Sequence, residues 1–312
     1  MTDVVEAYRP ELLVHCYRML GSVDDAEDGV QETMLRAWRA RDDYDPARAS
    51  RRTWLYRIAT NACLTALAGR SRRPLPSGLG GPPSDDPDAP LTPAWDVPWL
   101  QPFPDSRLPE ETVLRRGSLR LALVAALQVL PPKQRAVLVL REALDFPAAE
   151  VAAMLDTTVP AVDSALQRAR AAVAAVTEAE VTEPADAAVR STVDRYVRAF
   201  EIGDVKGLVR LLTDDVVMEL PPVPLWYRGG ASYAAFMRRV YAMRGEIWRV
   251  VRLEANTQPA FAAYARAPEG DFALHTLQVL TVSDDRVAHN VVFQDPAVFA
   301  DFALPPRLPA PA

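Results

Sequence analysis

The sequence has few of the features that mark disulfide-stabilised, zinc-binding or membrane-spanning proteins. Cys16 and Cys63 are its only cysteines and form no C-x-x-C pair, which argues against a disulfide framework or a thiolate zinc site. No stretch approaches the roughly 18 uninterrupted apolar residues of a transmembrane helix. The acidic N-terminus also lacks the basic and then apolar pattern of a signal peptide. We therefore expect a cytoplasmic protein that is not bound to a membrane and holds no metal or cofactor.

Lysine is almost absent too, since Lys133 and Lys206 are the only two, and arginine supplies nearly all the positive charge. The net charge of −6 and the isoelectric point near 5.3 argue against a protein that coats nucleic acid indiscriminately. With 312 residues, 49% of them apolar, the chain is long enough for two or three packed domains.

Three ordered segments are expected along the chain. Apolar residues recur at helical spacing in residues 3–73 and again in 111–178. Between them, residues 74–110 are so rich in proline that regular helix is excluded, and we predict a linker there. A third segment begins after Pro184 with a helical pattern and continues with strand-like runs.

Charge is segregated within the first segment. Residues 24–45 are dominated by acids, whereas residues 46–73 carry seven arginines and no acid. Such a run is often only a solvated face. Here Trp54, Tyr56, Arg57 and Asn61 are interleaved with the arginines and offer stacking surfaces, a guanidinium and an amide, the side chains that bind single-stranded nucleic acid. Core packing is the alternative for Trp54, and for Trp38 it is the interpretation we favour.

The second segment predicts a helix-turn-helix. Ala149, Val151, Ala152 and Leu155 form one apolar face, and Val162, Leu166 and Ala169 form another. The DTT sequence between them allows only a sharp turn, with Thr157 or Thr158 as the cap of the next helix. That helix would present its polar residues to a DNA groove, although antiparallel hairpins that bind no DNA share the pattern.

Together, these motifs resemble a known family. DAEDGVQETMLRAWRA, RTWLYRIATNACLTAL and LPPKQRAVLVLREALDFPAAEVAAMLDTTVPAVDSALQRARA closely resemble the two conserved domains of bacterial extracytoplasmic-function (ECF) RNA polymerase sigma factors. The resemblance covers about residues 5–73 and 115–176. It implies an all-α region 2 bundle and an all-α region 4 helix-turn-helix domain in a non-enzymatic subunit. The implied partners are the largest and second-largest subunits of core RNA polymerase and promoter DNA.

The resemblance also implies roles for individual residues. Core polymerase would be bound by Asp28, Gln31 and Glu32. The −10 element would be bound by Arg51, Arg52, Trp54, Arg57 and Asn61, with Asn61 at a pocket for a flipped base. The −35 element would be bound by Thr158, Ser164, Gln167, Arg168 and Arg170. Two positions depart from the family. Asp156 replaces the usual turn glycine, a change that aspartate tolerates better than most residues, and Asp163 stands where a basic residue is common.

The linker is long enough to separate two DNA-binding domains. About 36 residues, extended at ~3.1 Å each, reach roughly 110 Å. Sites about two and a half helical turns apart lie roughly 85 Å from each other on DNA. The acidic part of the linker would suit a positively charged nucleic-acid channel in the polymerase. The alternative is that it is only a solubilising spacer. Within WDVPWLQPFPD, Trp95, Trp99, Leu100 and Phe103 are too apolar for a free linker, and we expect the three rings to pack against the C-terminal domain.

The segment after Pro184 predicts two helices within 186–212, a strand at DVVMELPP, a helix at ASYAAFMRRVYAM and four further strands. This order resembles the α+β cone of SnoaL-like domains, and we predict such a regulatory domain over 185–312. A ligand pocket lined by Trp226, Tyr227, Tyr264 and His275 is one hypothesis, and catalysis by His275, His289 and Asp215 is another.

The favoured interpretation is an ECF-type sigma factor whose activity is modulated by its own C-terminal domain. The alternative is a SnoaL-like enzyme of the cyclase, isomerase or hydrolase type fused to a DNA-binding module. A helix-turn-helix repressor is a third interpretation, but it would not require the surface formed by Asp28, Gln31 and Glu32.

Overall fold

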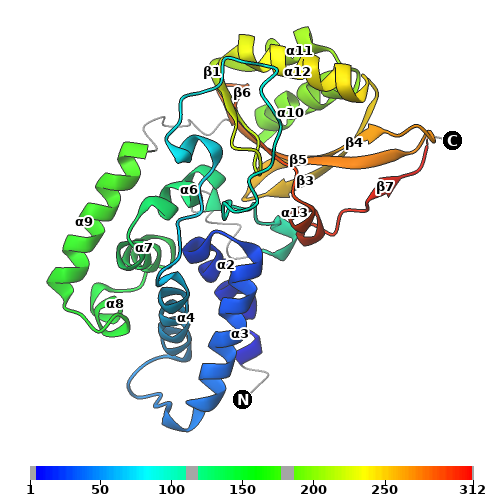
Figure 1. Cartoon of the computed structure of the whole chain (residues 1–312). Helices are drawn as coiled ribbons and strands as arrows, with labels where there is room; N and C mark the ends of the chain where they lie inside the picture. The colour runs from blue at the N-terminus through cyan, green and yellow to red at the C-terminus, as the bar shows by residue number, and fades with distance from the viewer. Residues whose placement is uncertain (1–4, 110–118, 177–185, 311–312) are drawn as a thin grey trace. The chain divides into compact units, whose positions relative to one another are not determined.

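A computed structural model describes residues 5–109, 119–176 and 186–310. The chain divides into two compact units, which are described separately (Figure 1). The first, here called the helical unit, comprises Met1–Arg73 and Leu100–Ala179. The second, the sheet unit, comprises Pro74–Trp99 and Glu180–Ala312. Segments distant in sequence therefore fold together in both units.

The first half of the helical unit is a three-helix bundle of α2 (Arg9–Leu20), α3 (Val23–Arg39) and α4 (Arg51–Leu67). Ser22 and Ser50 cap α3 and α4 by accepting hydrogen bonds from Asp25 N and Thr53 N. Gly21 ends α2 with a φ of 71°, and a Cβ there would lie 3.0 Å from both Leu100 and Gln128. This position therefore requires glycine.

The second half contains α6 (Leu121–Val129), α7 (Pro132–Leu138) with a π-helical turn (Val139–Ala143), α8 (Ala148–Met154) and α9 (Val159–Val176). The helix-turn-helix prediction is confirmed in α8 and α9. Thr158 precedes α9, and its hydroxyl accepts from Ala161 N at 3.4 Å. Asp156 adopts a φ of 47°, a left-handed turn conformation that suits the glycine implied at this position by the resemblance and that aspartate tolerates.

The sheet unit follows the predicted order of elements. Helices α10 (Asp186–Glu201) and α11 (Val205–Val209) precede β1 (Leu212–Glu219), a short β2 (Trp226–Arg228) and α12 (Gly230–Arg244). The remaining strands and helix are β3 (Trp248–Ala255), β4 (Gln258–Arg266), β5 (Phe272–Ser283), β6 (Arg286–Phe293), α13 (Pro296–Asp301) and β7 (Arg307–Leu308). The strand order is β2-β1-β6-β5-β4-β3, with β7 paired to β5, and among the described strands only β1 and β6 pair in parallel. Residues of α10 and α12 share the main core with one face of this sheet.

Residues 74–99, here called the strap, lie in the predicted linker and are docked on the sheet unit, with most of their contacts outside the aromatic motif that was expected to dock. Its backbone is held by side chains and backbone of the sheet unit. The bonds are Ser77 N to Glu219 Oε2 (2.7 Å), Trp226 Nε1 to Gly81 O (3.2 Å), Ser84 N to Trp226 O (2.8 Å), Tyr227 Oη to Asp86 O (3.1 Å), and Ala94 N to Pro222 O (2.9 Å). Irregular backbone can pack in this way because partners outside the strap satisfy its polar groups.

The four apolar residues predicted to dock differ in their surroundings. Trp95 is 61% exposed, so the prediction that its ring packs on the C-terminal domain is wrong. Phe103 is fully buried, but against Tyr17 of α2 with ring centroids 4.9 Å apart, and so lies in the helical unit instead. Leu100 is buried, and so is Trp99, whose indole donates to Ala94 O. The boundary between the two units falls between Trp99 and Leu100. Trp95 and Trp99 therefore belong to the sheet unit, and Leu100 and Phe103 belong to the helical unit.

Phe103→Ala should destabilise the helical unit by about 3–5 kcal/mol, the usual cost of truncating a fully buried phenylalanine. Trp95→Ala is the matched control, and an exposed side chain should change the free energy of unfolding by no more than about 0.5 kcal/mol. Urea denaturation followed by circular dichroism measures both variants. Equal effects of the two substitutions would contradict this assignment.

Candidate nucleic-acid interface

Helix α4 carries the residues predicted to bind unpaired DNA. Trp54, Arg57 and Asn61 lie one and two turns apart and therefore share one side of the helix. Trp54 is half-buried against Tyr44, at 5.0 Å between ring centroids, so its face is partly committed to packing. Arg57 is exposed, and the half-buried Asn61 amide makes no hydrogen bond with any residue that the structure describes. This side of α4 can therefore stack on a base, pair with a phosphate and hydrogen-bond a base edge.

The two arginines at the start of α4 have intramolecular partners. Arg51 lies over the Tyr44 ring at 5.5 Å. Arg52 pairs with Glu11 at 3.2 Å, and its guanidinium lies 4.8 Å from the Tyr56 centroid and 4.7 Å from that of Phe146. Arg52 thus connects α2, α4 and the loop before α8, and in this conformation it also supports the packing between them.

The helix-turn-helix covers part of this surface of α4. Thr53 Oγ1 donates to Glu150 Oε2 of α8 at 2.8 Å. Arg57 pairs with Asp156, in the turn before α9, at 3.4 Å. The Tyr56 and Phe146 rings meet edge-on with centroids 5.3 Å apart. In this conformation, Arg57 and the start of α4 are therefore engaged by the same chain that carries the predicted −35 reader.

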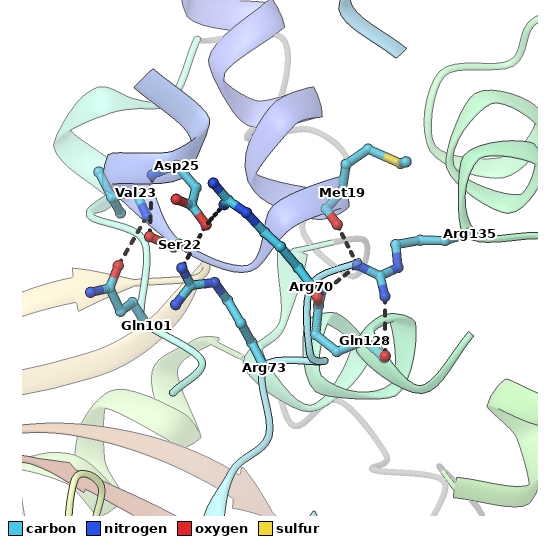
Figure 2. Close-up of polar contacts among 9 residues, drawn as sticks. All are labelled: Met19, Ser22, Val23, Asp25, Arg70, Arg73, Gln101, Gln128 and Arg135. Carbon is cyan, nitrogen blue, oxygen red and sulfur yellow. Dashed lines mark hydrogen bonds and ion pairs between the residues drawn. The ribbon is translucent and has the colours of Figure 1, made fainter. Parts of the chain in front are cut away.

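A buried arginine holds the two halves of the helical unit together (Figure 2). Arg135 of α7, only 3% exposed, donates to the Met19 carbonyl at the end of α2, to Gln128 Oε1 at 2.7 Å and to Gln128 O at 3.0 Å. Burial lowers the pKa of Arg135 to about 10, so the guanidinium stays charged at neutral pH. All of these acceptors are neutral oxygens, and each hydrogen bond offsets part of the cost of burying the charge.

Within the helical unit, residues just before and just after the strap are bound at the turn between α2 and α3 (Figure 2). Asp25, in the first turn of α3, pairs with Arg73 at 2.5 Å and with Arg70 at 3.1 Å. Gln101 accepts from Val23 N at 3.2 Å through its side chain, and its backbone carbonyl accepts from Tyr17 Oη at 2.8 Å. The chain thus leaves the helical unit and re-enters it at one place.

Helix α9 presents all five predicted −35 residues to solvent. Ser164, Gln167 and Arg168 are exposed at spacings of three and four residues and share one face, with Thr158 exposed at the helix start. Arg170 is also exposed but pairs with Glu142 of the π-helical turn. Asp163 lies exposed on the same helix and adds a negative charge there.

Helix α3 presents the predicted polymerase-binding residues together with two apolar residues that the sequence analysis missed. Asp28 and Gln31 are exposed, and Glu32 pairs with Arg36 at 2.7 Å. Leu35 and Trp38 continue the Gln31 face and are 49% and 62% exposed, so the expectation of core packing for Trp38 is wrong. The helical spacing of Gln31, Leu35 and Trp38 was the available signal, since it sets Trp38 away from the buried stripe.

The predicted pocket residues of the sheet unit do not lie together. A cavity of about 340 Å³ is lined by His275, but Trp226, Tyr227 and Tyr264 are not among its lining residues. Trp226 and Tyr227 bind the strap, and Tyr264 is buried in a separate cluster with Ala262 and Phe272. Strand alternation explains the error for Tyr264, because Phe261 and Ala263 are the residues of β4 in the main core.

The predicted catalytic residues are also dispersed. Asp215 is exposed, and His289 bonds Glu219 at 2.9 Å. Burial alone would raise the pKa of Glu219, but the bonds from His289 and Ser77 outweigh it and leave the pKa below its usual value. This carboxylate therefore anchors the strap. Among the residues described, no group of three or more His, Cys, Asp or Glu side chains could hold a metal ion, and no helix is long and apolar enough to cross a membrane.

Comparison with known proteins matches three parts of the chain to known domain families. Residues 4–73 match Sigma-70 region 2, residues 120–173 match Sigma-70 region 4, and residues 193–290 match the SnoaL-like domain. The ECF RNA polymerase sigma factor SigG of Mycobacterium tuberculosis is 46% identical over 312 residues, covering 97% of this chain and 83% of the relative. SigJ of the same species is 33% identical over 217 residues, covering 68% of this chain and 62% of SigJ.

A solved structure shares the fold over nearly the whole chain. The crystal structure of the Mycobacterium tuberculosis extracytoplasmic function sigma factor SigJ superposes with a TM-score of 0.68 and 24% identity. The match covers 98% of this chain and all of the SigJ chain. The arrangement of two helical segments followed by an α+β domain is thus a shared fold.

Arg135→Ala should lower the free energy of unfolding of the helical unit by about 3 kcal/mol, because several hydrogen bonds to a buried charge are lost. Lys133→Ala, an exposed change in the same helix, should have an effect within about 0.5 kcal/mol. Hydrogen exchange of the α2 and α7 amides reports the effect locally. Unchanged protection in Arg135→Ala would show that the arginine does not hold these helices together.

Proposed function

The chain belongs to the family of ECF RNA polymerase sigma factors, and from that premise we propose that the structure represents a closed state in which promoter recognition is blocked. Within this family, the chain binds core polymerase, recognises the −35 and −10 promoter elements and promotes transcription initiation. Closure means that the helix-turn-helix occupies part of the −10 surface. The contacts of Thr53 with Glu150 and of Arg57 with Asp156 carry this proposal.

In the proposed open state, core polymerase binds the exposed face of α3. Asp28, Gln31 and Glu32 supply its polar contacts, and Leu35 and Trp38 supply apolar area. An exposed tryptophan beside an exposed leucine favours a protein partner, because aromatic side chains are enriched at the centres of interfaces.

The α4 surface would then bind the opened −10 element. Trp54 stacks on a base, Arg57 contacts the backbone, and the Asn61 amide hydrogen-bonds a base that has left the duplex, which offsets the few kcal/mol that unstacking costs. Arg51 and Arg52 add positive charge, although Arg52 would first have to leave the Phe146 ring. Helix α9 reads the −35 element through Thr158, Ser164, Gln167, Arg168 and Arg170, as the exposure of these five side chains allows.

The strap makes the sheet unit a regulator in this proposal. While residues 74–99 are docked, they cannot contribute length between the two DNA-binding halves. If they are released and extended at ~3.1 Å per residue, they span roughly 80 Å, close to the roughly 85 Å between elements two and a half DNA turns apart. Undocking of the strap would therefore permit promoter binding.

In this proposal the sheet unit acts without catalysis. Among the described residues, none that lines the cavity is a carboxylate. Asp215 is exposed, and His289 bonds Glu219, the carboxylate that holds the strap. A general acid or base of the kind used by enzymes of this fold would therefore have only His275 available in the cavity.

Glu150→Gln combined with Asp156→Asn should raise run-off transcription by the reconstituted holoenzyme about two- to fivefold, because the first change removes the charge from the acceptor of the Thr53 hydrogen bond and the second removes the exposed ion pair with Arg57, at roughly 0.2–1 kcal/mol of closure each. Neither residue is among those proposed to bind DNA. The control is Glu246→Gln with Asp284→Asn, which changes the net charge equally on exposed positions of the sheet unit. Equal activation by both pairs would indicate a general charge effect and contradict the closed state.

Arg239→Ala should also raise transcription, because Arg239 donates to the carbonyls of Pro87 (2.8 Å) and Ala89 (2.7 Å) and so holds the strap. Limited proteolysis should cleave residues 84–94 faster in this variant. Arg238→Ala is the control on the same helix, where the side chain is exposed. Faster cleavage without increased transcription would separate the strap from regulation and refute this part of the proposal.

A further inference from the structure

The lining of the cavity in the sheet unit includes an amide network. Asn290 of β6 donates through Nδ2 to Tyr233 Oη at 2.8 Å and to Gln278 Oε1 at 2.9 Å, with Tyr196 Oη at 3.3 Å. Gln278 of β5 in turn donates to Thr276 Oγ1 at 3.2 Å. Gln278 Oε1 can only accept, and in this network it accepts from the nitrogen of Asn290.

This network leaves a buried acceptor without a partner. Asn290 lines the cavity and is 1% exposed, and its Oδ1 accepts no hydrogen bond from any residue in the part of the chain that the structure describes. Such an atom loses its hydration on burial and gains nothing in return. A hydrogen-bond donor placed in the cavity would satisfy it.

The lining of the cavity also carries a positive charge. Arg244, in the last turn of α12, lines the cavity, is exposed, and has no carboxylate within ion-pairing distance among the described residues. Burial and the neighbouring Arg244 guanidinium lower the pKa of His275 to about 4, so this imidazole is neutral at physiological pH. Arg239, the second lining arginine, already donates to the strap. Arg244 is therefore the group available to an anion.

The amide network contacts Tyr233 in the first turn of α12, whereas Arg244 lies in its last turn. Tyr233, which contacts Asn290, and Arg244 are about 16 Å apart along the helix axis at about 1.5 Å per residue. The wall between them is mostly apolar and includes Phe200, Met218, Leu220, Phe236 and Val240. Its volume of about 340 Å³ lies within the range of small-molecule sites. Leu91 of the strap completes this wall.

We propose that the cavity binds an amphipathic carboxylic acid that carries a hydroxyl group at the end remote from its carboxylate. The carboxylate pairs with Arg244, the hydroxyl donates to Asn290 Oδ1, and the apolar body packs against the wall and Leu91. Contact with Leu91 stabilises the docked strap, and for this consequence the inference rests on the proposed regulatory role. Binding of such a compound therefore favours the closed state.

The test uses the full chain and three probes of equal chain length: 10-hydroxydecanoate, decanoate and decane-1,10-diol. Isothermal titration calorimetry should show the hydroxy acid binding about tenfold more tightly than either of the other two, each of which lacks one polar contact. The hydroxyl is removed from the probe and not Asn290 from the protein, because Asn290 also holds Tyr196, Tyr233 and Gln278.

Arg244→Gln should weaken binding of the hydroxy acid about tenfold and leave binding of the diol unchanged, and Arg238→Gln should leave both unchanged. Bound hydroxy acid should also slow proteolysis of the strap, and Leu91→Ala should abolish that protection. Failure of the hydroxy acid to bind at about 1 mM, or equal binding of the three probes, would overturn the inference. Either result leaves the closed state standing, because that is tested separately by the Glu150 and Asp156 variants.

Discussion

The closed helical unit depends on Arg135, a charge buried among neutral oxygens. Its guanidinium joins α7 to the end of α2 and to Gln128 of α6. A buried charge without a carboxylate is stable only while its hydrogen bonds are intact, so partial separation of these helices would strand it. We therefore expect the two halves of the unit to be either packed or fully apart, which is the behaviour required of a switch.

Because the two halves are either packed or fully apart, weak surface contacts between them can shift the balance between the closed and open states. The contacts of Thr53 with Glu150 and of Arg57 with Asp156 are individually small, yet they lie on the surface that the proposed function assigns to opened DNA. In the proposed function, docking of the strap also restrains opening, since the docked residues would otherwise link the separated halves. A ligand that stabilises the strap through Leu91 would bias the same equilibrium by its difference in affinity for the two states.

The sequence predicted the elements that depend on local pattern. Helical spacing located the helix-turn-helix, Thr158 was one of its two predicted caps, and strand periodicity predicted the order of the sheet unit. Long-range packing could not be predicted in the same way. Proline density excluded helix in residues 74–99 but gave no information on what those residues contact. Trp38 looked like a core residue by type alone, and Tyr264 was assigned to the pocket although strand alternation turns it to the other face.

The most direct test of the account is the distance between α4 and α9 in the free chain and in the promoter complex. Fluorescence energy transfer between labels on Thr65→Cys and Ala171→Cys, both exposed positions, would measure it, because the native Cys16 and Cys63 are buried and react poorly. The account predicts high transfer in the free chain and loss of transfer with core polymerase and promoter DNA, where the two recognition surfaces are roughly 85 Å apart. Low transfer in the free chain, or equal transfer in both states, would contradict it.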